Sequence, residues 1–146
     1  MVGSKPIKNV LLVEDNPSYQ DLMLVAFEEN DIAHNLHIVN NAEDALLFLR
    51  QAQKYCDSPS PDIIILDLDL PRMHGHELLK IIKKDIKYKL IPVIVFTSSN
   101  HQKDILESYN LKANCYLSKP YELDDFLAIV QKSLNFWLNF SKLPEI

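Results

Sequence analysis

The chain has 146 residues, a length that suits one domain, and its composition of 47% apolar and 24% charged residues is globular. Fifteen Lys and Arg against 20 Asp and Glu give a formal net charge of −5, which argues against nucleic acid or an anionic membrane as the main partner. With only two glycines, the chain cannot form a glycine-rich phosphate loop. Its two cysteines are too few for a disulfide scaffold and favour a cytoplasmic protein. The sequence has no apolar run long enough to cross a membrane.

Short apolar runs alternate with amphipathic stretches along the chain. The runs predict strands at 10–13, 36–39, 63–66, 92–96 and 114–117. Helical spacing of apolar residues predicts helices at 17 to about 30, 42–49, 78–86, 102–109 and 123–140. Asn16 before Pro17, and Asn41 three residues before Asp44, are typical helix starts. Five strand–helix units indicate an α/β fold with a parallel sheet between two helical layers.

A single proline-rich spot interrupts this pattern. Residues 58–61 read Ser-Pro-Ser-Pro, a loop too short to separate two domains. We therefore expect one domain over 1–146, with its core at about 8–140 and no output domain.

Polar side chains follow four of the predicted strands. In parallel sheets with helices on both faces, ligands bind beyond the carboxyl ends of the strands. Glu14 and Asp15 follow the first strand, Asp67 the third, Thr97 the fourth and Lys119 the fifth. Carboxylates without His or Cys favour a hard cation such as Mg²⁺, and a lysine suits phosphate. This set is sufficient for phosphoryl transfer to an aspartate nucleophile.

The spacing of these residues resembles that of the receiver domains of two-component response regulators. The resemblance covers essentially the whole chain and rests on Asp15, Asp67, Pro71, Gly75, Thr97 and the pair Lys119-Pro120. It implies a doubly wound, flavodoxin-like sheet with strand order 2-1-3-4-5, in which Pro71 and Gly75 have structural roles. It also implies a signalling domain that catalyses only its own aspartyl phosphorylation and dephosphorylation.

The resemblance assigns the phosphoacceptor and the metal ligands. Asp67 would accept a phosphoryl group from the phosphohistidine of a histidine kinase. Mg²⁺ would be held by Asp15, Asp67 and the backbone carbonyl of Asp69, and Glu14 would support the metal without being a direct ligand. Asp69 stands where the family often has Asn, and its carboxylate is expected to repel a phosphoryl dianion and to bind the metal more tightly.

The resemblance also assigns a switch. Thr97 and Lys119 would bind the phosphoryl group, and Tyr116 would follow Thr97 when the hydroxyl moves toward it. The bond between Lys119 and Pro120 would be cis. An ordinary strand aromatic with its hydroxyl in water explains Tyr116 equally well at this stage.

The last predicted helix has two apolar stripes, although packing once onto a sheet requires one. The first holds Leu123, Leu127, Val130, Leu134, Trp137 and Leu138, and the second Phe126, Ile129, Phe136 and Phe140. The second stripe could cover a neighbouring helix of the same chain. We favour a homodimer interface made by Phe126, Ile129, Phe136, Trp137 and Phe140, because two-fold self-association is the commonest assembly.

The tail, the leader before the first strand and the loop at 58–61 resemble response regulators that are paired with bacterial phytochromes. This narrower resemblance implies a phytochrome histidine kinase as phosphodonor. It also implies a homodimer through the side formed by the last two helices and the strand between them.

Two other functions fit parts of the sequence. Asp67-Leu68-Asp69 matches the Asp-x-Asp signature of haloacid-dehalogenase-like phosphatases, but that family carries the signature after its first strand rather than its third. A phosphate-independent interaction module is also conceivable, although the complete set Asp15, Asp67, Thr97 and Lys119 argues against it.

Overall fold

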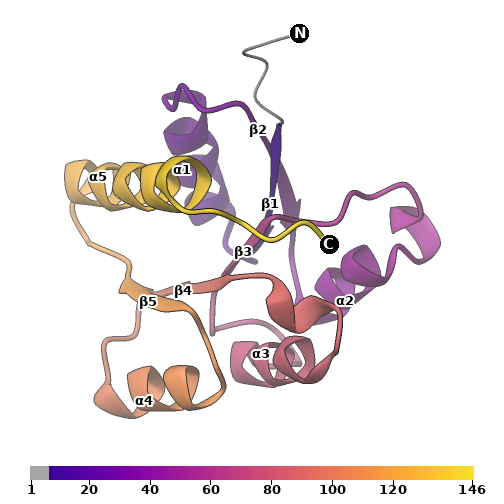
Figure 1. The fold of residues 1–146 in the computed structure, drawn as a ribbon. Coiled ribbons are helices and arrows are strands. Elements are labelled where there is room, and N and C mark those ends of the chain that lie inside the picture. The colour runs from indigo at the N-terminus through magenta and orange to yellow at the C-terminus, as the bar shows by residue number, and fades with distance from the viewer. Residues whose placement is uncertain (1–6) are drawn as a thin grey trace, which may run out of the picture.

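The computed structural model describes residues 7–146, which form one parallel sheet between helices (Figure 1). The sheet has the order β2-β1-β3-β4-β5, and every neighbouring pair of strands is parallel. The strands are β1 (Lys8–Val13), β2 (His34–Val39), β3 (Ile63–Leu66), β4 (Val93–Thr97) and β5 (Cys115–Ser118). The predicted fold class and strand order are confirmed.

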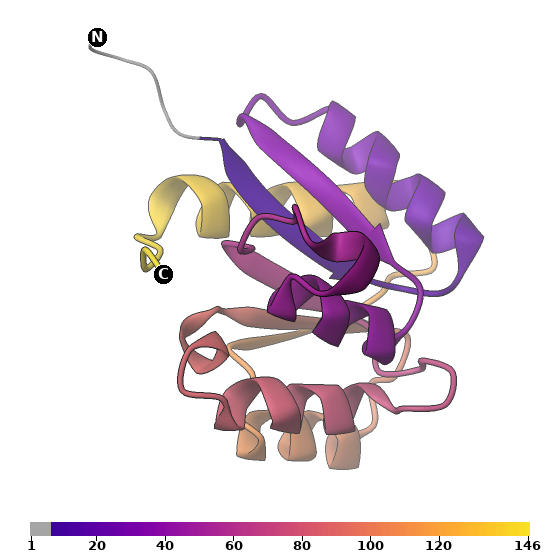
Figure 2. The same cartoon turned by 90° about the vertical axis from the view of Figure 1, so that its right-hand side faces the viewer.

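Helices cover both faces of the sheet (Figures 1 and 2). They are α1 (Pro17–Glu28), α2 (Ala42–Arg50), α3 (Gly75–Lys84), α4 (Gln102–Asn110) and α5 (Leu123–Leu134), which continues as a π-helix (Asn135–Phe140). Short 3₁₀ turns occupy Gln53–Tyr55 and Tyr88–Leu90. Helices α1 and α5 cover one face, and α2 and α3 cover the other. Among the described residues, no helix is both long enough and apolar enough to cross a membrane.

The central strands are apolar on both faces, and each face belongs to a separate core. Along β1, Val10 and Leu12 pack with α1 and α5, whereas Leu11 and Val13 pack with α2 and α3. All four residues of β3 are buried. Continuous apolar runs are therefore what this sheet requires.

Two predicted helix starts are confirmed by their side-chain caps. The Asn16 Oδ1 accepts from the backbone N–H groups of Ser18 (2.9 Å) and Tyr19 (3.4 Å). The Asn41 Oδ1 accepts from the N–H of Asp44 at 2.7 Å. Each cap satisfies a backbone donor that the first turn of a helix leaves free.

Helix α3 ends earlier than its apolar pattern predicts. It stops at Lys84, and Ile86 is 82% exposed instead of continuing the buried stripe. The reason is Asp85, whose carboxylate accepts from the N–H groups of Lys87 (2.8 Å) and Tyr88 (3.1 Å). Aspartate offers the backbone this alternative to a further helical turn.

The last helix covers its predicted span of 123–140, but its final part is wider than an α-helix. Residues Asn135–Phe140 are π-helical, and the N–H of Ser141 donates to the carbonyl of Phe136 at 2.8 Å. The hydroxyls of Ser133 and Ser141 also donate to carbonyls four residues earlier. Such bonds from serine commonly bend a helix.

Candidate functional site

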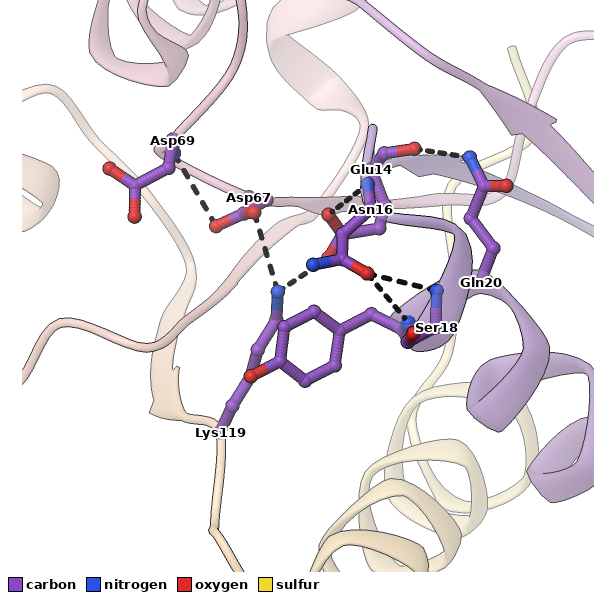
Figure 3. A network of polar contacts seen from close by, with 8 residues as sticks. Glu14, Asn16, Ser18, Gln20, Asp67, Asp69 and Lys119 are labelled. Carbon is purple, nitrogen blue, oxygen red and sulfur yellow. Dashed lines mark hydrogen bonds and ion pairs between the residues drawn. The ribbon is translucent and has the colours of Figure 1, made fainter.

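The carboxyl ends of β1, β3 and β5 bring charged side chains to one edge of the sheet (Figure 3). An open hollow lies there, lined by Asp15, Asn16, Pro17, Tyr19, Asp67, Asp69, Ser98 and Lys119. Residues from four different loops thus share one site, as the topology of a doubly wound sheet predicts.

A buried lysine between two buried carboxylates forms the centre of the site. The Lys119 Nζ lies 3.3 Å from the Asp67 Oδ2 and makes a closer contact with the Glu14 Oε1 (Figure 3). All three side chains are almost completely withdrawn from solvent. Charges buried this deeply are stable only when they are paired.

The two carboxylates outnumber the one ammonium. The pKa of Glu14 is raised to about 7, first by burial and also by the negative charge of Asp67, while Lys119 opposes both effects. An added positive charge would favour the ionised form of this carboxyl and would balance the excess negative charge. The electrostatics of the site therefore favour a cation.

Asp15 adds a third carboxylate. One oxygen of each of Glu14, Asp15 and Asp67 lies within 4.8 Å of the other two, and Asp15 is the exposed member. The Asp69 carboxylate is outside this group, and its backbone N–H donates to the Asp67 Oδ1 at 3.4 Å. A set of oxygen donors without nitrogen or sulfur fits a hard divalent ion.

Thr97, the last residue of β4, supplies a hydroxyl without a partner. The side chain is fully buried, and its Oγ1 has no hydrogen-bond partner among the described residues. Leaving a buried hydroxyl unpaired costs about 1–3 kcal/mol, so an acceptor oxygen that reached it would be bound favourably.

The hydroxyl of Tyr116 does not lie free in water. It donates to the backbone carbonyl of Ser99 in the loop between β4 and α4, at 2.8 Å. The ring packs against the core on the α2 and α3 side, and burial raises the pKa of the phenol. The hydroxyl therefore has a partner within the protein and is not bound by water alone.

Pro71 and Gly75 lie in the connection between β3 and α3. The carbonyl of Pro71 accepts from the N–H of Met73 at 2.8 Å. A Cβ at Gly75 would stand 2.5 Å from the Asp67 carbonyl oxygen and 2.7 Å from the Leu68 Cα. The start of α3 is therefore pressed against the backbone that carries Asp67.

The predicted cis bond between Lys119 and Pro120 is wrong. Residues 7–146 contain no cis peptide bond, so this bond is trans. The N–H of Lys119 donates to the carbonyl of Thr97 at 2.7 Å, which holds the lysine at the sheet edge. Trans is the more stable isomer of a bond that precedes proline.

The predicted dimer surface is partly wrong. Phe126 is 1% exposed and packs on Phe96 within the core, so it cannot form part of an interface. Ile129 and Trp137 are half-buried against the same core, whereas Phe136 and Phe140 are 53% and 74% exposed. The first half of the second stripe therefore covers the chain's own core.

Tyr19 is a site residue that the sequence reasoning missed. It lines the hollow, and the Lys119 Nζ lies 3.7 Å from the centroid of its ring. Its position in the sequence could have indicated it, because Tyr19 lies in the first turn of the helix that follows Glu14 and Asp15.

Comparisons with known proteins point to one family. The family model described as "Response regulator receiver domain" matches residues 10–131. Response regulator Rcp1 of Synechocystis sp. is 40% identical over 141 residues, which cover 97% of this chain and 96% of Rcp1. The probable methanogenesis regulatory protein FilR2 of Methanothrix harundinacea is 33% identical, over 92% of this chain and 86% of FilR2.

Solved structures agree in fold and length. The phosphorylated cyanobacterial phytochrome response regulator RcpA superposes with a TM-score of 0.92 at 37% identity, covering 96% of this chain and 100% of RcpA. The Mn²⁺-bound form of Rcp1 superposes with a TM-score of 0.90 at 40% identity, covering 94% and 99%. These comparisons give no support to a haloacid-dehalogenase-like phosphatase. The chain belongs to the receiver domains of two-component response regulators and is similar to those of cyanobacterial phytochromes.

Proposed function

We propose that the chain acts as a stand-alone response regulator, which accepts a phosphoryl group on Asp67 from a phytochrome histidine kinase and then changes its protein contacts. The observation that carries this proposal is the pairing of a buried Asp67 with Lys119, together with a buried Thr97 hydroxyl that has no hydrogen-bond partner within residues 7–146. The similarity to RcpA, described as a phosphorylated phytochrome response regulator, supports the choice of donor.

In the proposed reaction, a carboxylate oxygen of Asp67 forms a bond to the phosphorus of the donor phosphohistidine. The phosphorus–nitrogen bond breaks, and the imidazole leaves with the electron pair and takes up a proton. Lys119 neutralises charge on the transferring group, and the Thr97 hydroxyl donates to one of its oxygens. The same groups would support hydrolysis of the aspartyl phosphate, when water replaces the imidazole.

The reaction needs a divalent cation, for which the carboxylates of this site are suited. We infer that Mg²⁺ is held by Asp15, Asp67 and the backbone carbonyl of Asp69, while Glu14 supports the site through its pairing with Lys119. When bound, Mg²⁺ neutralises the negative charge that collects between the carboxylates and the phosphoryl group. The Mn²⁺-bound form of the relative Rcp1 supports the binding of a divalent ion, and the group Glu14, Asp15 and Asp67 is where this chain offers carboxylates for one.

Movement of Thr97 would be passed to the surface through Tyr116. An aspartyl phosphate adds negative charge and acceptor oxygens, which attract the Thr97 hydroxyl. Thr97 is two residues before Ser99, whose carbonyl accepts from Tyr116. A shift of this loop would release the tyrosine, so that it could occupy the space that Thr97 leaves.

We further propose that the output is a protein contact and that the chain forms a homodimer in the cytoplasm. The exposed Phe136 and Phe140, with the half-buried Ile129 and Trp137, would contribute to the interface beside α4, β5 and α5. Neither nucleic acid nor a membrane is proposed as a partner, because the chain has an excess of acidic residues.

Acetyl phosphate with Mg²⁺ tests the phosphoacceptor. We expect the intact mass of the wild type to rise by one phosphoryl group, and Asp67→Asn to remain unmodified. Asp69→Asn is the matched control, since it removes a nearby carboxylate and keeps the acceptor. Removing the metal with EDTA should abolish labelling of the wild type.

Two results would contradict the proposal. The first is undiminished labelling of Asp67→Asn, which would place the phosphoryl group on another residue. The second is multiple turnover of a small phosphomonoester, because that would identify a phosphatase instead of a phosphoacceptor.

A further inference from the structure

The aromatic ring of Tyr19 lies against the ammonium group of Lys119. The Nζ atom is 3.7 Å from the ring centroid, well inside the range of a cation–π interaction, which extends to about 6 Å. Tyr19 comes from the first turn of α1, whereas Lys119 follows β5, so the contact closes the site between two distant segments. We propose that Tyr19 is a positioning residue, whose ring holds the Lys119 ammonium within reach of Asp67 and thereby sets the rate at which Asp67 is phosphorylated.

Lys119 requires such a constraint because it has two competing anionic partners. Its Nζ contacts Glu14 more closely than Asp67, from which it is 3.3 Å away. A lysine is a flexible point charge, which two carboxylates alone do not fix in direction. The face of the Tyr19 ring contacts the ammonium as a third partner beside the two carboxylates. Because the lysine side chain is 3% exposed, water competes little with this contact.

The ring is itself held in place by the core. It stacks on Phe126 with a centroid distance of 5.9 Å and an interplanar angle of 13°. Phe126 is buried and packs on Phe96 of β4. The N–H of Tyr19 is also bound by the cap residue Asn16. A ring supported in this way can position its neighbour, because few of its own rotamers remain available.

A series of replacements at position 19 separates the electronic effect of the ring from its packing. Tyr19→Phe keeps an electron-rich face, Tyr19→4-cyanophenylalanine keeps the ring shape with an electron-poor face, and Tyr19→Leu removes the ring. Two quantities are measured: the proton chemical shifts of the Lys119 CεH₂ group by NMR, and the rate of Asp67 labelling by acetyl phosphate with Mg²⁺.

The ring current of Tyr19 should shift the Lys119 CεH₂ protons upfield, and this shift should disappear in Tyr19→Leu and persist in both ring variants. The labelling rate should stay within about twofold in Tyr19→Phe and fall about tenfold in the 4-cyano and leucine variants. Packing alone would leave the 4-cyano variant as fast as phenylalanine, so that result would overturn the proposal. Unchanged CεH₂ shifts in Tyr19→Leu would also overturn it.

The rate measurement rests on the proposed function, but the NMR measurement does not. If the wild type takes up no phosphoryl group on Asp67, the proposed function fails, while the chemical shifts still decide whether the ring contacts Lys119. The two shape-preserving variants keep the test decisive even if Tyr19→Leu unfolds.

Discussion

At position 75, the absence of a side chain decides how closely α3 can approach the segment after β3. The N–H of Gly75 donates to the carbonyl of Leu68 at 2.9 Å, and a Cβ there would lie 2.5 Å from the carbonyl oxygen of Asp67. Both obstacles are backbone atoms, which cannot turn away as a side chain could. The glycine therefore determines the placement of the same residue that we propose as the phosphoacceptor.

Gly75→Ala should lower the free energy of unfolding by about 1–3 kcal/mol, the usual cost of inserting a group into a filled space. It should also slow the labelling of Asp67, because the segment that carries this residue must shift to admit the methyl group. Urea denaturation and intact mass after treatment with acetyl phosphate provide the two measurements. Lys80→Ala, at an exposed position of the same helix, is the control. Wild-type stability in Gly75→Ala would contradict the close approach.

Individual site residues differ in how far the sequence could indicate them. Asp67 and Lys119 directly follow strands and Asp15 comes one residue later than that, so a parallel topology alone predicts that they meet. Tyr19 acts through a ring that reaches the site from inside a helix, and no strand end marks it. The hydrogen bond between Tyr116 and Ser99 depends on the path of a loop, which one-dimensional patterns do not contain.

At the scale of elements, apolar runs and helical spacing predicted the five strands and the five α-helices but neither 3₁₀ turn, and polar side chains explain how two of the helices end. Asp85 ends α3 by binding the next backbone donors, and Ser133 and Ser141 accompany the change from α- to π-helix.

The side chain of Lys83 joins α3 to the segments that follow it in the chain. Its Nζ donates to the carbonyls of Lys89 (3.1 Å) and Ile91 (2.8 Å) and to the Asn114 Oδ1 (2.9 Å).

Lys83→Met keeps the aliphatic stem but leaves these acceptors without their donor. We expect it to lower the free energy of unfolding by about 1 kcal/mol at neutral pH, the net value of a typical hydrogen bond. Chemical denaturation measures this difference, and Lys84→Met, at the exposed neighbouring position, is the control. Equal stability of Lys83→Met and the wild type would show that the lysine does not join these segments.

The difference in the free energy of unfolding between the wild type and Lys83→Met should depend on pH, with a sign that the pKa of Lys83 determines. Burial lowers the pKa of Lys83 from 10.5 to about 8 in the folded state. Between these two values the unfolded chain binds more protons than the folded chain, so the contribution of this group to stability rises with pH. The stability advantage of the wild type over Lys83→Met should therefore grow from pH 7 to pH 10. A shrinking advantage would contradict the lowered pKa.

At the scale of the whole molecule, α5 is both a core element and a surface element. Phe126, Val130 and Leu134 are buried against the sheet. Beyond Leu134 the π-helix changes the angular position of the side chains that follow, and Phe136 and Phe140 are exposed. Two large aromatic side chains exposed on one short segment are typical of a surface that binds another protein.

Because a second copy of the chain is the proposed partner, the double variant Phe136→Ser and Phe140→Ser should shift the dimer toward monomer. Interfaces of this kind depend on a few aromatic anchors, so the dissociation constant should rise about tenfold or more. Sedimentation equilibrium over a range of concentrations, with and without acetyl phosphate and Mg²⁺, gives this constant in both states. Leu24→Ser with Val25→Ser is the matched control, since these α1 residues are 42% and 43% exposed and lie outside the proposed interface. If the α1 variant dissociated while the aromatic variant did not, the subunits would have to associate through α1, and the exposed end of the last helix would remain available to another partner.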